Sequence, residues 1–169
     1  MSTASVETLS QDRALRRAFS VYPTGVVALG AQVDGKVAGM AVNSFTSISL
    51  EPALVAVSVA RTSRTWPLLA SVPELGMSVL ASHHEALSRS LSAREGDRFD
   101  GHEWRETVNG AVLIEGAALW LTCTPRSVFD GGDHEIALFE IKDITLFDDV
   151  EPLIFHQSRY RSISTDVAV

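Results

Sequence analysis

Residues 61–65 of this sequence combine charge and hydroxyl groups in a way that suits an anion. The segment reads Arg61-Thr62-Ser63-Arg64-Thr65, and it follows an apolar stretch and precedes Trp66-Pro67, a helix start. Hydroxyls and free backbone N–H groups at a helix start hold phosphates, and arginine adds charge and a forked donor. An anion site is one interpretation. The other is a polar loop in which Thr65 caps the helix and the arginines are solvated.

Two further segments carry side chains that could orient a ligand. Residues 43–49, Asn-Ser-Phe-Thr-Ser-Ile-Ser, place amide and hydroxyl groups inside an apolar region, where they could bind the edge of a polar heteroaromatic ring. The alternative is an edge strand whose Ser and Thr side chains face water. The turn Gly131-Gly132-Asp133-His134 presents a histidine at the start of a strand. A structural histidine with satisfied hydrogen bonds is the alternative there.

Other chemistry is disfavoured by the residues present. His83-His84-Glu85 and Asp133-His134-Glu135 hold metal-ligand types, but neighbouring side chains point in different directions, so we expect no metal site. We expect His83 and His84 to be solvated near a helix start. Cys123 follows an apolar strand and is expected to be a small buried hydrophobe. The Gly-rich dinucleotide and phosphate loops and the Gly-x-Ser-x-Gly elbow do not occur.

Composition and charge argue against several further classes of protein. The 169 residues carry a formal net charge of −7, which argues against a nucleic-acid partner, because such affinity depends on Lys and Arg. One cysteine allows no internal disulfide, and no apolar run approaches a membrane span. We therefore expect a soluble, cytoplasmic protein without membrane contact. The Ser/Thr-rich start predicts a flexible segment over residues 1–10. No stretch of linker composition divides the rest, so we expect a single domain over 11–169.

The apolar pattern indicates many short strands and few helices. Ser10 can cap a short helix in which Leu15, Ala18 and Phe19 share a face, and Asp34-Gly35 is a hairpin turn. An antiparallel β-rich barrel or sandwich is therefore expected rather than a parallel α/β sheet. The predicted strands cover residues 26–33, 37–50, 54–59, 76–80, 112–122, 135–147 and 152–156; the predicted helices cover 66–72 and 85–91, and 94–106 is a predicted loop.

Several landmarks occur in an order that resembles the short-chain flavin reductases, the reductase components of two-component flavin-dependent monooxygenases. The resemblance runs from Phe19 to Tyr160. Its landmarks are residues 22–26 (Tyr-Pro-Thr-Gly-Val), 39–47, 50–52 (Leu-Glu-Pro), 97–101 (Asp-Arg-Phe-Asp-Gly), 131–134 and 152–156, followed by Arg159-Tyr160.

The resemblance implies an antiparallel split β-barrel of the FMN-binding type with a few short flanking helices, a homodimer, and FMN or FAD as the flavin. Ser78 departs from the family, which often has asparagine there, so contacts to the outer part of the flavin nucleotide stay open. The implied site residues are Gly39, Met40, Ala41, Asn43 and Ser44 along the flavin ring and ribityl chain, Ser58, Val59 and Ala60 in the same pocket, Ser63, Arg64 and Thr65 at the phosphate, and His134 and Tyr160 at the nicotinamide, with His134 the candidate catalytic residue.

The implied reaction passes a hydride from NADH or NADPH to the flavin, which then leaves for a separate monooxygenase. The protein would stack and orient two rings and supply no nucleophile, which suits a sequence poor in catalytic motifs. A non-catalytic flavin-binding module and an oxidase of the pyridoxamine-phosphate type are the alternatives. The choice of flavin, the choice of nicotinamide, the retention or release of flavin and the partner oxygenase stay open.

Overall fold

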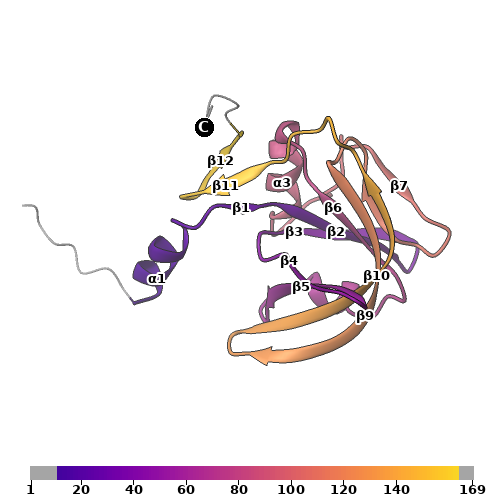
Figure 1. The fold of residues 1–169 in the computed structure, drawn as a ribbon, viewed down its shortest axis with the longest axis horizontal. Helices are drawn as coiled ribbons and strands as arrows, with labels where there is room; N and C mark the ends of the chain where they lie inside the picture. Colours follow the sequence, from indigo (N-terminus) through magenta and orange to yellow (C-terminus); the bar gives the residue numbers. More distant parts are fainter. Residues whose placement is uncertain (1–10, 164–169) are drawn as a thin grey trace, which may run out of the picture.

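The Asp34-Gly35 pair forms the turn of the first hairpin in the computed structural model, which describes residues 11–163 (Figure 1). Both residues have positive φ, 51° and 74°, as a tight two-residue hairpin turn requires. On either side of the turn, β2 (Val27–Val33) pairs antiparallel with β3 (Lys36–Val42). The predicted hairpin is confirmed. The expectations for Ser10 and for residues 1–10 fall outside the described residues.

One antiparallel sheet contains most of the strands. Within residues 11–163 it has seven strands in the order β3-β2-β6-β9-β10-β5-β4. The long β9–β10 hairpin lies in the middle and projects beyond the body of the molecule (Figure 1). The remaining strands are β4 (Thr46–Leu50), β5 (Ala53–Ala60), β6 (Leu75–Val79), β9 (Leu119–Gly131) and β10 (His134–Leu146).

The two edge strands of this sheet are neighbours in the sequence. β3 ends at Val42 and β4 begins at Thr46, yet they stand at opposite ends of the strand order. Four extended residues span at most about 14 Å. The sheet must therefore curl until its edges approach each other, which makes a barrel that is split between β3 and β4. This agrees with the split barrel that the sequence resemblance implies.

Short helices and two small sheets complete the described chain. The helices are α1 (Gln11–Phe19), α2 (Trp66–Leu69), the 3-10 turn η1 (Ser82–His84) and α3 (Glu85–Leu91). No helix in this part of the chain has the length and apolar character needed to cross a membrane. The small sheets contain β1 (Thr24–Gly25), β11 (Ile154–His156) and β12 (Arg159–Arg161), and β7 (Trp104–Glu106) with β8 (Val112–Ile114).

Several predicted boundaries are wrong. The strand expected over residues 37–50 is two strands, β3 and β4, separated by residues 43–45, and β9 continues to Gly131, beyond the predicted end at residue 122. The helix expected over residues 66–72 ends at Leu69, and Pro73 disfavours helical geometry at Val72, the last residue predicted as helical. The strand expected over 112–122 is interrupted at Gly116, whose φ of 74° belongs to a turn. The loop expected over 94–106 contains β7, where Trp104 packs edge-on against Phe99 with ring centroids 6.1 Å apart.

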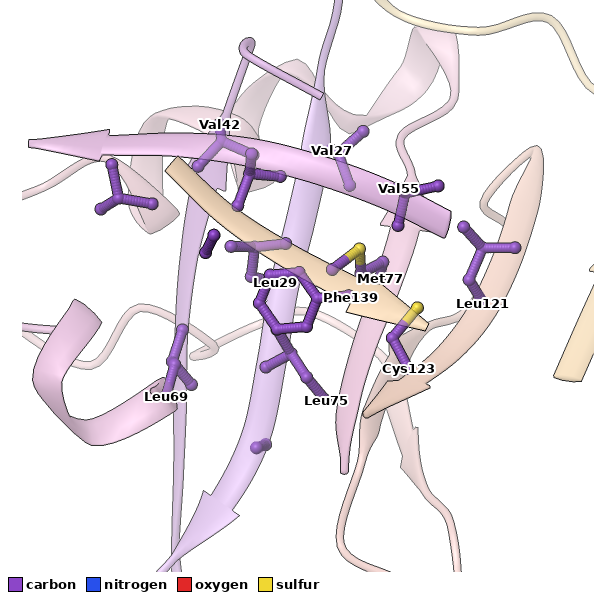
Figure 2. Packing of buried hydrophobic residues seen from close by; sticks show 14 of the residues in the cluster. Val27, Leu29, Val42, Val55, Leu69, Leu75, Met77, Leu121, Cys123 and Phe139 are labelled. Atoms are coloured by element: carbon purple, nitrogen blue, oxygen red, sulfur yellow. The ribbon is translucent and has the colours of Figure 1, made fainter. Parts of the chain in front are cut away.

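Apolar side chains fill both sides of the curved sheet. Inside the barrel, Leu29, Met77, Cys123 and Phe139 belong to one buried cluster (Figure 2). A second cluster, which includes Leu87 and Leu91 of α3, covers the other face. The residues at the ends of β3 and β5 lie between these two clusters. The barrel holds them in place, and several remain partly accessible.

Candidate functional site

A cavity of about 750 Å³ opens where β3, the end of β5 and the segment after α3 meet. None of its described lining residues carries a carboxylate, although the whole chain has a net charge of −7. The positive charge is therefore concentrated locally, which favours an anionic ligand. The lining consists of four arginines (Arg16, Arg64, Arg94, Arg98), hydroxyl residues (Thr62, Ser63, Thr65, Ser92) and apolar residues (Met40, Ala41, Ala60, Leu91, Ala93).

The 61–65 loop is shaped by hydrogen bonds to its own backbone. Ser63 N–H donates to the Ala60 carbonyl at 2.9 Å, and Ser63 Oγ accepts from Trp66 N–H at 3.1 Å. Ser63, rather than Thr65, therefore supplies the side-chain acceptor at the start of α2. Thr65 makes no capping hydrogen bond with its side chain. The capping alternative for Thr65 is wrong, because its hydroxyl is engaged elsewhere.

The partner of Thr65 is Arg98. Arg98 Nη1 donates to Thr65 Oγ1 at 2.7 Å and to the Gly39 carbonyl at 3.0 Å, so it joins the loop to β3. Its neighbour Phe99 is 6% exposed and packs in the second cluster, which helps to fix the position of Arg98. Sequence reasoning recorded residues 97–101 as a family landmark but assigned them no chemistry. A lone arginine in a charged loop gave no indication of partners 33 and 59 positions away.

Arg61 binds the β9–β10 hairpin, whereas the other residues of the 61–65 loop line the cavity. Its guanidinium donates to Glu135 Oε1 at 2.9 Å, to Asp130 Oδ1 at 2.6 Å and to the Gly132 carbonyl at 2.9 Å. The hydrogen bond from Arg61 holds the pKa of Asp130 below its ordinary value. The interpretation that both guanidinium groups of residues 61–65 serve an anion is therefore wrong for Arg61.

The same network ties the β9–β10 hairpin to the cavity loop. Glu135 Oε2 accepts from Trp66 Nε1 at 2.8 Å, so one carboxylate binds both Arg61 and a core residue. The backbone adds a further link, from Arg61 N–H to the Asp133 carbonyl at 3.0 Å. These contacts fix the hairpin tip, including His134, relative to the 61–65 loop.

His134 begins β10 directly beside the cavity wall. It is the cross-strand neighbour of Ala60, which lines the cavity, while His134 itself is not among the lining residues. Its Nδ1 lies 2.7 Å from Asp133 Oδ1, and this hydrogen bond lowers the pKa of Asp133. The imidazole is partly exposed, with 42% of the side chain accessible. It is therefore free to contact a ligand that lies across the cavity mouth.

Tyr160 lines a smaller cavity of about 200 Å³ together with Asn43. The two cavities share Ala41 and Ser92, so they adjoin. The Tyr160 hydroxyl lies 2.9 Å from Ser88 Oγ, and the Arg89 guanidinium lies 4.9 Å from the ring centroid. Within one chain, the structure does not bring Tyr160 and His134 to the same cavity.

Ser44, just before β4, meets Ser58 of β5 where the β4–β5 pairing continues. Ser44 Oγ donates to the Ser58 carbonyl at 2.8 Å and accepts from Ser58 N–H at 3.0 Å. Thr46–Leu50 forms an exposed edge strand, as the alternative for residues 43–49 proposed. The Val59 side chain is 2% exposed and packs in the barrel core, so it does not line the cavity.

Gly39 lies next to the main cavity. It lines a third cavity of about 550 Å³, and Arg64, Thr65, Arg94 and Arg98 line both. The candidate residues on β3 therefore lie along two adjoining cavities.

Several residues considered from sequence have structural roles. Cys123 is buried, as predicted, and burial raises its pKa to about 12. Ser78 is fully buried, and its Oγ accepts from Ile114 N–H at 2.9 Å, so it has no access to a ligand. In residues 11–163, no group of three or more His, Cys, Asp or Glu side chains is arranged to hold a metal ion.

The expectation of a solvated His84 is wrong. The η1 turn carries its ring back over the chain, where Nδ1 accepts from Ala81 N–H at 3.1 Å. Only 8% of the residue is exposed, and burial lowers its pKa to about 4. His83, its neighbour, is exposed as predicted.

Comparison with known proteins gives a consistent result over almost the whole chain. The family model described as flavin reductase like domain matches residues 19–164. A flavin reductase of Pseudomonas putida is 35% identical over 146 residues, covering 86% of each chain. The reductase subunit HsaB of a flavin-dependent monooxygenase from Rhodococcus jostii (strain RHA1) is 31% identical over 157 residues, covering 93% of this chain and 80% of HsaB.

Solved structures agree with these sequence matches. The Streptomyces globisporus C-1027 NADH:FAD oxidoreductase SgcE6, solved in complex with NAD and FAD fragments, is 33% identical. It superposes with a TM-score of 0.88 and covers 94% of this chain and 96% of its own. The barrel and the arrangement of its strands are therefore shared with that oxidoreductase.

Proposed function

The chain belongs to the flavin reductase-like domain family, and we propose that it transfers a hydride from NADH or NADPH to FMN or FAD. One observation in the structure carries this proposal. The cavity beside β3 and β5 has an apolar wall and four arginines, and no described lining residue is acidic. A planar, uncharged ring system that carries a phosphate has the same division into apolar and anionic parts.

The residues present fit such a ligand. Met40, Ala41 and Ala60 provide small or flexible apolar surface for the ring, in the same cavity as the polar residues. Ser63, Arg64 and Thr65 would hold the phosphate, with Arg98 as a fourth member that the sequence did not indicate. Gly39, Asn43, Ser44 and Ser58 would lie along the ring and its chain, Val59 through its backbone alone.

Bound flavin would accept the hydride and bound nicotinamide would donate it. The chain's residues would orient the two rings, because orientation controls the transfer. His134 projects beside Ala60 at the cavity wall, where it can hydrogen-bond the nicotinamide. Tyr160 lines the adjoining cavity, which shares Ala41 and Ser92 with the main one, and would approach the nicotinamide from there.

Reduced flavin would then pass to a separate monooxygenase. A relative covered over 80% of its length is the reductase subunit of a flavin-dependent monooxygenase, and this supports the same division of labour here. Flavin acts in such a scheme as a released product. Modest affinity for flavin is therefore expected.

The test is NADH and NADPH oxidation with each flavin, under aerobic and anaerobic conditions. The rate should require flavin and saturate with its concentration. No flavin-stimulated oxidation in folded protein would reject the reductase function and favour a non-catalytic flavin-binding module. Oxidation of a small amine by tightly bound FMN, without a nicotinamide, would instead identify an oxidase.

We also propose a homodimer. Large apolar side chains are exposed on β4 and on the β9–β10 hairpin, among them Leu50 at 94% and Phe129 at 54%. Exposed large apolar side chains favour association, and a two-fold pair is the commonest assembly. Sedimentation should give twice the chain mass. An active monomer at micromolar concentration would contradict the proposal.

A further inference from the structure

A second positively charged cavity lies beside α1. It has a volume of about 800 Å³ and is lined by Arg13, Arg16, Arg17, Ser20, Val21, Gln157 and Ser158. No described residue of the lining is acidic. Arg16 also lines the main cavity between β3 and β5, so the two cavities meet at this side chain.

Among the described residues, neither packing nor an ion pair accounts for the arginines of α1. None of the residues of α1 is buried, and the helix stands apart from the sheets (Figure 1). Within residues 11–163, no carboxylate lies within 4 Å of Arg13, Arg16 or Arg17 in an ion pair. Arg16 and Arg17 complement the helix dipole from the last turn. Arg13 lies a turn earlier, so its charge has no such role.

The opposite wall of this cavity is the turn of the β11–β12 hairpin. Gln157 and Ser158 have φ of 49° and 59°, the left-handed geometry that a two-residue hairpin turn requires. The turn is fixed against α1, because Gln157 N–H donates to the Ser20 carbonyl at 2.8 Å.

The cavity also adjoins the proposed nicotinamide position. The pKa of Asp133 is lowered chiefly by the His134 hydrogen bond, and the positive charge of Arg16 adds a smaller contribution. Arg16 therefore lies close enough to the hairpin tip to act on the residue next to His134. It stands between the hairpin, the main cavity and the other two arginines.

We infer that Arg13, Arg16 and Arg17 form a binding site for the phosphates of the nicotinamide dinucleotide. The inference rests on the proposed function. A nicotinamide ring beside His134 leaves its pyrophosphate outside the flavin cavity, and the arginines of α1 provide the adjoining positive surface. Arginine is suited to this role because its forked donors match phosphate oxygens.

The experiment compares two hydride donors. NADH carries a pyrophosphate, whereas N-benzyl-1,4-dihydronicotinamide has the same reacting ring and no phosphate. In the double variant Arg13→Gln/Arg17→Gln, the KM for NADH should rise about tenfold or more, as expected for a lost charge-assisted contact. The KM for the benzyl donor should stay within about twofold. An equal change for both donors, or none for NADH, would overturn the inference.

A matched control is Arg126→Gln, because Arg126 is an exposed arginine on β9 that pairs with Glu140 and lines none of these cavities. Its KM for NADH should equal that of the wild type. A rise comparable to that of the double variant would show a general effect of net charge and would overturn the inference.

Arg16 needs a separate experiment, because it lines both cavities. Arg16→Gln should weaken NAD⁺ binding to the flavin-loaded protein, measured by calorimetry, while the ratio of FMN to riboflavin affinity stays unchanged. A fall in that ratio would assign Arg16 to the flavin phosphate and overturn its place in this site. If wild-type protein oxidises neither donor with any flavin, the proposed function fails. Calorimetry of inorganic pyrophosphate with wild type and the double variant then tests the arginines independently.

Discussion

Arg98 Nη1 lies 2.7 Å from Thr65 Oγ1, and this hydrogen bond connects two loops that are separated by 33 positions in the sequence. The same nitrogen also binds the Gly39 carbonyl of β3. One guanidinium therefore holds the 61–65 loop, the 94–101 loop and a strand of the barrel together. Arg98 also lines the cavity, and its Nε and Nη2 donors take no part in these two hydrogen bonds.

Replacing Thr65 by valine should affect FMN and riboflavin differently. Valine keeps the shape of the side chain but removes the acceptor of Arg98 and a hydroxyl of the proposed phosphate site. We expect FMN affinity to fall on the order of tenfold, and riboflavin affinity to change by less than about twofold. Fluorescence quenching measures both. Thr65→Ser keeps the hydroxyl and serves as the control; equal losses for the two flavins would place the phosphate elsewhere.

His134→Ala should impair the use of nicotinamide and spare the flavin. The imidazole hydrogen-bonds Asp133 and belongs to neither buried cluster, so its removal should leave the barrel intact. We expect kcat/KM for NADH to fall roughly ten- to a hundredfold, as for one or two positioned hydrogen bonds. Flavin affinity should be unchanged by fluorescence quenching. Unaltered kinetics in folded protein would return His134 to a structural role.

Arg61→Met should loosen the hairpin tip without opening the barrel. The substitution removes the guanidinium that donates to three acceptors on the hairpin, and methionine keeps most of the aliphatic part of the side chain. We expect faster amide hydrogen exchange over residues 131–134 and a fall of about three- to tenfold in kcat/KM for NADH. A double-mutant cycle with Asp130→Asn isolates the ion pair. Wild-type exchange at the hairpin tip would show that the β-ladder alone holds His134.

The buried His84 should make stability depend on pH. Burial lowers its pKa from 6.5 to about 4, so the unfolded chain takes up a proton at a higher pH than the folded protein does. Stability should therefore fall as the pH is lowered from about 6.5 to about 4, by up to about 3 kcal/mol. Urea unfolding at several pH values measures this.

His84→Asn provides the matched comparison. The asparagine side-chain oxygen can replace Nδ1 as acceptor for Ala81 N–H, but it does not titrate. The variant should lose less stability than the wild type over the same pH range. Identical pH dependence in the two proteins would assign it to other groups.

The sequence predicted those elements whose geometry is set by residues close together in the chain. The Asp34-Gly35 turn requires left-handed geometry, which these residue types accept, and the hairpin formed as predicted. The helix over residues 85–91 also matches the structure. The end of α2 was missed, although Pro73 was present as a signal.

Contacts between distant segments could not be predicted in this way. Arg61 and Arg64 are similar in sequence context, yet one binds the β9–β10 hairpin and the other lines the cavity. His83 and His84 are adjacent, yet only the second is buried. In each pair, tertiary packing decides the environment, and the sequence around the residues does not distinguish them.

The central place of the β9–β10 hairpin has a consequence for how the chain is synthesised. β9 pairs with β6 and β10 pairs with β5, so in the described sheet the hairpin joins the β3-β2-β6 group to the β5-β4 group. A growing chain that ends before Leu119 holds both groups but neither joining strand. The edges of β5 and β6 then stay unpaired on the ribosome, where they can pair with other chains. Barrel closure is thus a late event, completed only after most of the protein has emerged.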